Sequence, residues 1–284
     1  MIQTLPLFEP LDNELLTLLR SLSRQDWSRT TIAGAWTVRD VVGHLLDTPL
    51  RRLSFVRDGW PPDVEIRSEA DLVRFVNAMN AEGVRTYGRL SPAVLIDLMT
   101  LAAAQLRDHL RASAPDDIAA FPVSWAGEST SAHWFDVARE YTERWHHQAQ
   151  IRLAVGALEP LMTTRFYAPL VATFMRVLPH ALRDLEAPES GRIVVIVDGA
   201  GGGAWTLTRE HAAWHLDGPA GAPGPDAERP DPEPAPLAHV TIPARIAWRL
   251  FTKGLSAHDI ARDCQASGDH VLAGAVLRSR AIVG

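Results

Sequence analysis

Glu143 and His147 are the first residues whose types and spacing could support chemistry. Residues four apart on a helix lie about 40° apart around its axis, so this carboxylate and this imidazole can converge on one point. One carboxylate and one imidazole make a partial metal site. The alternative is a solvated helix face on which Glu143 takes part in salt bridges with Arg139 and Arg144.

A third ligand has to come from another helix, and His44 is the best candidate. It lies beside Val41 and Leu45, near the expected inward face of its own helix. Two imidazoles and a carboxylate suit Zn²⁺, and also Ni²⁺, Fe²⁺ or Mn²⁺. Three protein ligands leave a position open for water or substrate, as in catalytic metal sites. Trp36 and Trp145, close in sequence to these ligands, could keep water from the site.

His146 is the alternative to His147, because it follows Glu143 by three residues and is also within reach of that helix face. His147 is favoured because it is nearer in angle to Glu140 and Glu143. Glu140, one turn earlier on the same stripe, could then hydrogen-bond a ligand and orient it. We therefore expect His44, Glu143 and His147 to bind the metal.

Helices are expected to position these residues throughout the first half of the chain, because apolar residues recur there at three- and four-residue steps. Thr37 and Asp40 can cap the start of the helix that carries His44, and Ser91-Pro92 can start a later one. Short connections between such helices favour an antiparallel bundle. The expected helices cover residues 8–22, 37–55, 72–87, 91–111 and 133–155.

The second half of the chain has a different character. One helix is expected at about residues 164–185, and β-branched or alternating segments then predict strands. Helical patterns return at 243–251 and 269–278. We expect an α+β protein with a helical domain at residues 1–158 and a smaller α+β domain at 159–284. The expected strands are 192–198, 205–209, 213–217 and 238–242.

Two Gly-rich segments of the second half are interpreted as loops. Residues 218–236 are dense in Pro, Gly, Ala and acidic side chains, which cannot bury enough apolar surface to offset their ordering entropy, so a mobile loop is expected. Residues 197–204 superficially match a dinucleotide-binding fingerprint. That motif requires a helix next, whereas Trp205-Thr-Leu-Thr alternates like a strand, and a Gly-rich hairpin is expected instead.

Composition limits the classes of partner. The formal net charge is -6 and the sequence has no block of Lys or Arg, which argues against nucleic-acid binding. No window approaches the roughly 18 uninterrupted apolar residues of a membrane span. The single cysteine, Cys264, excludes an internal disulfide and is interpreted as a small buried hydrophobe. We expect a cytoplasmic monomer or homodimer that acts on small molecules.

Two motifs resemble those of a known family. Trp36-Thr-Val-Arg-Asp-Val-Val-Gly-His44 and Glu143-Arg-Trp-His-His147-Gln-Ala-Gln-Ile-Arg resemble motifs of the mycothiol-dependent maleylpyruvate isomerase family, a branch of the DinB-like metal-binding bundles. The segments Trp125-Ala-Gly and Phe75-Val-Asn also agree with that family. The resemblance spans most of residues 8–156 and implies an antiparallel four-helix bundle that binds metal through His44, Glu143 and His147.

The chain departs from the family pattern in its doubled histidine and in Gln150, where an Asp is frequent. The second half resembles the sterol-carrier-like α+β domain that often follows this bundle, through Gly268-Asp269 and the segment 248–254. That resemblance implies a basic residue near the active cleft. Arg249 and Lys253 are candidates, and neither is assigned a catalytic role.

The resemblance implies a metal-dependent enzyme that uses mycothiol or another low-molecular-weight thiol and an electrophilic substrate. The metal would lower the thiol pKa and hold a thiolate at neutral pH. In an isomerase the thiolate adds to an activated double bond and later leaves, whereas in a thiol transferase it stays on the product. The alternatives are a non-catalytic protein that binds a metal or an apolar ligand, and a module in which the metal only stabilises the bundle.

Overall fold

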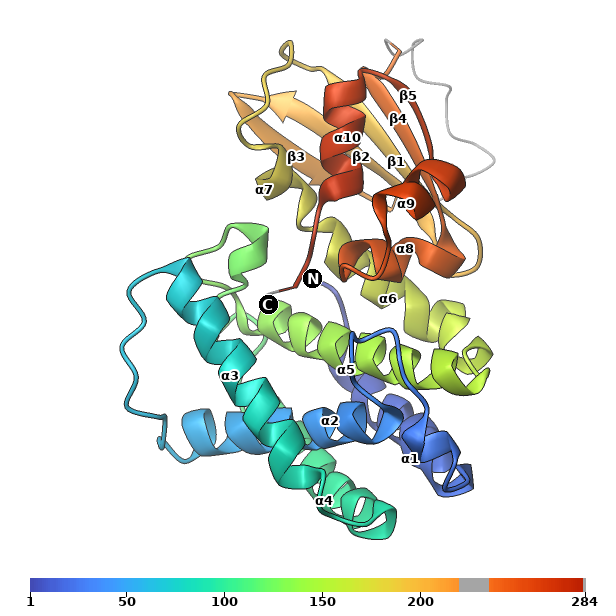
Figure 1. Cartoon of the computed structure of the whole chain (residues 1–284). Helices are drawn as coiled ribbons and strands as arrows, with labels where there is room; N and C mark the ends of the chain where they lie inside the picture. The colour runs from blue at the N-terminus through green and yellow to red at the C-terminus, as the bar shows by residue number, and fades with distance from the viewer. Residues whose placement is uncertain (220–234, 283–284) are drawn as a thin grey trace. The chain divides into compact units, whose positions relative to one another are not determined.

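The computed structural model describes residues 1–219 and 235–282. These residues form two compact units, a helical one and one built on a mixed β-sheet (Figure 1). This architecture confirms the predicted α+β class, while the predicted domain limits 1–158 and 159–284 stay a prediction. Among the described residues, no helix is long and apolar enough to cross a membrane. The helical unit comprises residues 1–122 and 130–161, and the second unit comprises 123–129 and 162–282.

Five helices in the first unit lie where apolar periodicity predicts them. Helices α1, α2, α4 and α5 pack on one another, and α3 lies against α2. Their shared core contains Leu19, Leu45, Met99 and Ile151, one from each of the four packed helices. Burying a side chain of this size contributes about 1.5–3 kcal/mol to folding. The bounds are α1 Phe8–Ser21, α2 Val38–Arg52, α3 Glu69–Tyr87, α4 Pro92–Arg111 and α5 His133–Val155.

The start of α2 is determined by the predicted capping box. The Asp40 carboxylate accepts a hydrogen bond from the Thr37 backbone N–H at 2.9 Å, and the Asp40 N–H donates to the Thr37 hydroxyl at 3.3 Å. Such a cap contributes about 1 kcal/mol. Because His44 lies within the first two turns, this cap also helps to set the direction of its side chain.

Helix α5 buries polar as well as apolar residues. Asp136 and Tyr141 are fully buried, and both His146 and His147 are more than nine-tenths buried. The helix ends at Gly156, whose φ of 71° lies in the left-handed region that glycine adopts without strain. Of the candidate ligands on α5, His147 is therefore buried and Glu143 is partly exposed.

The second unit is a five-stranded sheet in the order β3-β2-β1-β4-β5. Strands β1 and β2 form the predicted Gly-rich hairpin, with Val197 opposite Gly203, while β1 and β4 run parallel. Helix α10 packs against β4 and β5 (Figure 1). The strands are β1 Arg192–Asp198, β2 Gly203–Glu210, β3 Ala213–Asp217, β4 Ala238–Pro243 and β5 Gln265–Gly268. The helices are α6 Thr164–Met175, α7 Leu178–Leu182, α8 Ala244–Phe251, α9 Ala257–Asp263 and α10 His270–Arg278.

Three expectations for this unit need correction. The single helix expected over 164–185 is wrong, because α6 ends at Met175 and α7 begins at Leu178. In an uninterrupted helix, the backbone N–H of residue 179 would donate to the carbonyl oxygen of residue 175. Pro179 has no such N–H. Helix α9 and the edge strand β5 were not predicted, since both are short and β5 has no β-branched residue.

The third correction concerns Cys264, which is half-buried instead of fully buried. Burial, and to a lesser degree Asp263, raises the pKa of its thiol to about 11. The thiol therefore stays protonated at neutral pH and is a poor nucleophile. Most of the loop predicted at 218–236 lies outside the described residues, which stop at 219 and resume at 235.

Candidate metal centre

His44, Glu143 and His147 lie together in the helical unit. One possible ligand atom from each lies within 4.8 Å of the others. Nε2 of His147 is 3.5 Å from Oε2 of Glu143 across one turn of α5. The ring of His44, from α2, meets the His147 ring edge to face, with 4.5 Å between their centroids. The structure thus brings together the three residues predicted from sequence.

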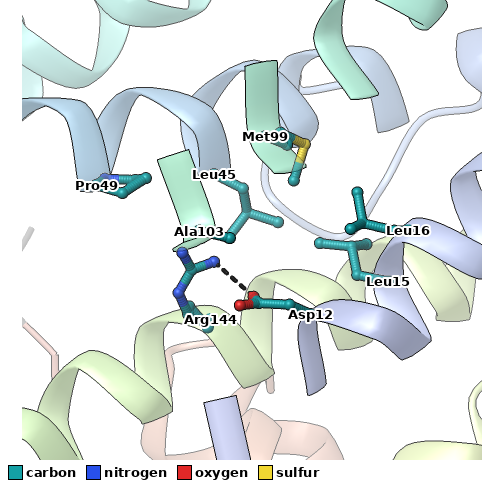
Figure 2. Close-up of a pocket in the computed structure, with 8 residues that line it drawn as sticks. All are labelled: Asp12, Leu15, Leu16, Leu45, Pro49, Met99, Ala103 and Arg144. Atoms are coloured by element: carbon teal, nitrogen blue, oxygen red, sulfur yellow. Dashed lines mark hydrogen bonds and ion pairs between the residues drawn. The ribbon is translucent and has the colours of Figure 1, made fainter. Parts of the chain in front are cut away.

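The two arginines that could have formed a salt-bridged face with Glu143 pair with other carboxylates. Arg144 donates to Oδ1 of Asp12 at 3.0 Å (Figure 2), and Arg139 forms an ion pair with Asp136. Glu143 lies beside His147 instead, with Oε2 at 3.5 Å from Nε2. This arrangement favours the interpretation of Glu143 as part of a polar cluster over that of a solvated face.

His44 has a buried nitrogen without a partner. Its side chain is more than nine-tenths buried, and its Nδ1 makes no hydrogen bond to any described residue. Burial, followed by the neighbouring His147, holds the pKa of His44 well below its usual range. The ring is therefore neutral at physiological pH, which is the form that binds metals. The Trp36 ring lies 5.2 Å from it between centroids and shields it on one side.

His146 is engaged differently from His147. Its Nδ1 lies 2.9 Å from the Thr142 carbonyl oxygen one turn earlier, so this nitrogen donates within α5. Burial, and then the adjacent His147, lowers the pKa of His146 to about 4. The group of side chains with converging ligand atoms contains His147 and not His146. The geometry therefore favours the choice of His147 made from sequence.

Gln150 orients the ring of His147. The Gln150 Oε1 lies 2.9 Å from Nδ1 of His147, so Nδ1–H donates to the amide and Nε2 lies on the side of Glu143. Glu140 was expected to orient a ligand from the preceding turn, but it lies 3.5 Å from a terminal nitrogen of Arg52. In the structure Gln150 has the role proposed for Glu140.

The Glu143 carboxyl is ionised in this environment. Burial raises its pKa, but the neighbouring His146 and His147 have a larger combined effect and hold it below the usual range. The cluster then consists of one carboxylate and two imidazoles, of which His44 is neutral. A set of one anionic oxygen and two nitrogen donors is suited to a divalent cation.

Two buried ion networks near the site were missed in the sequence analysis. Arg52 donates to both oxygens of Asp136, at 3.2 and 2.5 Å, and the Phe121 ring lies 5.7 Å from its guanidinium carbon. Asp12 accepts hydrogen bonds from Arg107 and from Arg144. The bond from Arg144 lies at the edge of a small pocket inside the bundle (Figure 2). The partners are 84 to 132 residues apart, so local spacing has no signal for them.

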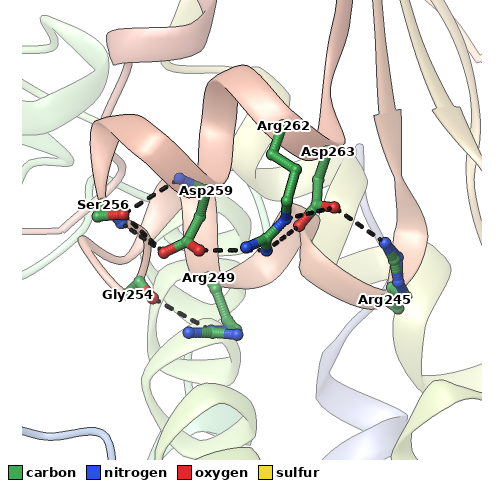
Figure 3. Close-up of polar contacts among 7 residues, drawn as sticks. All are labelled: Arg245, Arg249, Gly254, Ser256, Asp259, Arg262 and Asp263. Carbon is green, nitrogen blue, oxygen red and sulfur yellow. Dashed lines mark hydrogen bonds and ion pairs between the residues drawn. The ribbon is translucent and has the colours of Figure 1, made fainter.

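Arg249 and Lys253, the basic candidates of the second unit, lie in and just after α8. Nε of Arg249 donates to the Gly254 carbonyl oxygen at 3.1 Å (Figure 3). Lys253 has a φ of 62°, in the left-handed region. Close by, Asp263 bonds to Arg262 and pairs with Arg245. The contact that Arg249 makes holds the turn between α8 and α9, and a role for either residue in catalysis stays a prediction.

The fold and the cluster together define a class, that of α+β proteins whose helical unit has a two-histidine, one-glutamate site suited to a metal. The sequence model of the mycothiol maleylpyruvate isomerase N-terminal domain matches residues 8–152, which is more than half of the chain. The chain belongs to this family. That membership confirms the resemblance seen in the motifs and agrees with the prediction of an enzyme.

Two solved structures share the fold. The crystal structure of the mycothiol-dependent maleylpyruvate isomerase is similar at 14% identity and a TM-score of 0.53, over 93% of this chain and 92% of that chain. A histidine-to-alanine mutant of the mycothiol-dependent maleylpyruvate isomerase is similar at 14% identity and a TM-score of 0.51, over the same shares. The comparison with curated proteins found no match.

Proposed function

We propose that the chain is a mycothiol-dependent enzyme of the maleylpyruvate isomerase type, in which a divalent metal activates the thiol. Membership of the family supports the use of mycothiol and an isomerase-like reaction. The observation that carries the metal is the convergence of His44, Glu143 and His147 within 4.8 Å. The expected partners are the thiol and a small electrophilic substrate, and the proposal includes a cytoplasmic location.

Zn²⁺ is the first candidate for the ion, with Ni²⁺, Fe²⁺ and Mn²⁺ as the others. Ligand atoms at about 2.0–2.2 Å from a tetrahedral Zn²⁺ lie about 3.3–3.6 Å from one another. The distance of 3.5 Å between His147 Nε2 and Glu143 Oε2 agrees with this value. The unpartnered Nδ1 of buried His44 also agrees, because a buried polar atom without a partner costs about 1–3 kcal/mol.

The residues around the site keep the three candidate ligand side chains in forms that can bind a metal ion. His44 remains neutral because it is buried, and Glu143 remains ionised because two histidines lie beside it. Gln150 holds the His147 ring with Nε2 on the side of Glu143. A bound divalent cation would lower the pKa of a thiol at its open position and hold the thiolate at neutral pH. Trp36, whose ring lies 5.2 Å from that of His44 between centroids, limits the access of water on that side.

The protein's own cysteine has no part in this chemistry, because its thiol is protonated at neutral pH. In the isomerase reaction the external thiolate adds to an activated double bond of the substrate. Rotation about the resulting single bond follows, and elimination of the thiol restores the double bond. In a thiol transferase the same adduct would be released as product, so the two reactions differ only in the fate of the adduct.

Metal analysis of purified protein and matched variants tests this proposal. We expect wild type and His146→Ala to contain metal, and His44→Ala, Glu143→Gln and His147→Ala to lose it. His146→Ala is the control for His147→Ala, because both remove a buried imidazole from adjacent positions of α5. Equal metal in all five proteins would contradict the assignment, and loss only in His146→Ala would transfer the ligand role to that residue.

Mycothiol titration and turnover then test the enzyme. We expect metal-loaded wild type to bind mycothiol and to isomerise maleylpyruvate, or to join the thiol to an electrophile. Accumulation of the thiol adduct would identify a transferase, and its absence with isomerised product would identify an isomerase. Metal binding without any affinity for a thiol would instead support a non-catalytic metal-binding protein.

A further inference from the structure

An open pocket of about 500 Å³ lies between α2, α3 and the segment that joins them. Asp47 and Arg51 line it from α2, Phe75, Met79 and Glu82 line it from α3, and Val64 lines it from the joining segment. Pockets that bind small ligands have volumes of about 300–1,000 Å³. All of the lining residues belong to the helical unit, so the pocket is complete within it.

The two helices run antiparallel, and their register gives the pocket one polar and one apolar end. Arg51 donates to Asn80 at 2.9 Å, and a Cβ added at Gly83 would come 2.3 Å from Asp47 Oδ2. Because the helices are antiparallel, residues further along the first chain segment lie beside earlier residues of α3. Phe55 therefore lies at about the level of Phe75. Asp47 and Glu82 are thus at one end together with Tyr87, and Phe55 and Phe75 are at the other.

The polar end has more acidic than basic charge. Arg51 is the basic residue in its lining, and it is already engaged by Asp47, at 2.9 Å, and by Asn80. Glu82 adds a second carboxylate. A ligand with a carboxylate would meet two like charges here and would have to displace the partners of Arg51, whereas a cation would meet an excess of negative charge.

Asp47 is largely buried beside Arg51. Its side chain is about nine-tenths buried, and its Oδ2 accepts no hydrogen bond of good geometry from the described residues, although Arg51 is close. Burial raises the pKa of the Asp47 carboxyl, and Glu82 adds to the rise against the opposing effect of Arg51. A largely buried carboxylate beside a second carboxylate is stabilised by a positive charge that enters the pocket.

We propose that this α2–α3 pocket binds a small molecule with an apolar, ring-sized body and a protonated amine as its head. The body packs between Phe55, Phe75 and Met79, and the ammonium group donates toward Asp47 and Glu82. Arg51 and His44 are seven residues apart on α2, which places them on nearly the same side and about 10 Å apart along the axis. The end of the pocket that takes the amine is therefore the end nearer to His44 along α2. Binding requires no metal or thiol, so it is independent of the proposed function.

Methyl NMR of methionine-labelled protein tests the proposal, because Met79 lines the pocket while Met99 lies in the bundle core. The probes are 2-phenylethylamine, the neutral 2-phenylethanol and the anionic 3-phenylpropionate. We expect saturable shifts of Met79 but not of Met99, with the amine tightest and the carboxylate weakest. No saturable shift with the amine, or tighter binding of the carboxylate, would overturn the proposal.

Variants separate charge from shape. Glu82→Gln is expected to weaken amine binding about two- to fivefold, as for a partly exposed charge pair, and to leave the alcohol unaffected. Glu9→Gln, an exposed acidic position on α1, is the charge-matched control and should change neither. Ala78→Trp, at an exposed position in the pocket wall, should block all three probes. Unchanged amine affinity in either Glu82→Gln or Ala78→Trp would refute the assignment.

Discussion

Nδ1 of His147 lies 2.9 Å from Oε1 of Gln150, which makes the amide the hydrogen-bond acceptor for this imidazole. The partner of this imidazole is therefore a neutral amide. A carboxylate makes a ligating imidazole more basic than an amide does. Gln150 therefore orients His147 while adding little to its basicity.

Gln150→Ala should weaken metal binding about 10- to 100-fold, the usual effect of removing a partner that orients a ligand. Gln150→Asp should bind at least as tightly as wild type, because it restores an acceptor that is also charged. Competition with a chelating dye measures both affinities. Equal affinity in wild type and Gln150→Ala would show that this hydrogen bond does not orient the ligand.

Metal-free protein should lose stability as the pH falls below about 6.5, the usual pKa of histidine. The pKa of His44 is lowered by burial, and that of His146 is lowered to about 4, so the unfolded chain takes up protons that the folded chain does not. Each histidine then contributes a slope of about 1.4 kcal/mol per pH unit, and for His146 this continues down to its folded pKa.

Urea unfolding of chelator-treated protein at pH 7.5, 6.5 and 5.5 measures this slope. His146→Gln is the informative variant, because its amide can still donate to the Thr142 carbonyl but cannot take up a proton. The variant should show a shallower dependence on pH than wild type. A free energy of unfolding that is constant over this range would mean that the buried histidines titrate normally.

Arg52→Met should destabilise the helical unit by about 3–5 kcal/mol, the range for breaking one side of a buried ion pair. Arg52 and Asp136 are 5% and 0% exposed, so the carboxylate would keep only Arg139 as its charged partner. Denaturant unfolding gives the free energy. Arg57→Met, which removes the exposed pair with Asp58, is the control and should leave stability unchanged. A similar small effect of both variants would contradict the role assigned to Arg52.

Gly83→Ala should destabilise the contact between α2 and α3 by about 1–3 kcal/mol, as overpacking does. The new Cβ would lie 3.0 Å from Asp47 Cβ and 2.3 Å from its Oδ2, so the whole side chain would have to shift. Gly43→Ala is matched on the opposite helix, where the nearest atom is Tyr87 Cβ at 3.4 Å. That variant should be neutral or slightly stabilising, because alanine favours helix by about 1 kcal/mol. Thermal unfolding compares the two.

The helices of the first unit could be predicted because their signals are local. The capping box of Thr37 and Asp40, the Ser91 cap before Pro92 and the glycine stop at Gly156 each act within one turn of their helix. Apolar periodicity indicated which face of each helix is buried. The pairing of Glu143 with His147 needed no more than helical spacing.

Pairings between distant segments were decided by the packing of the bundle. His44 was proposed from its place on the expected inward face of its helix and then from a family motif, since no spacing within one helix relates residues on α2 and α5. The partner of Arg52 and the choice of His147 over His146 depended on which side chains the packed helices bring together. Side-chain pairing across helices follows from their crossing and rotation, and these depend on the whole core, whereas capping and periodicity depend on near neighbours in the chain.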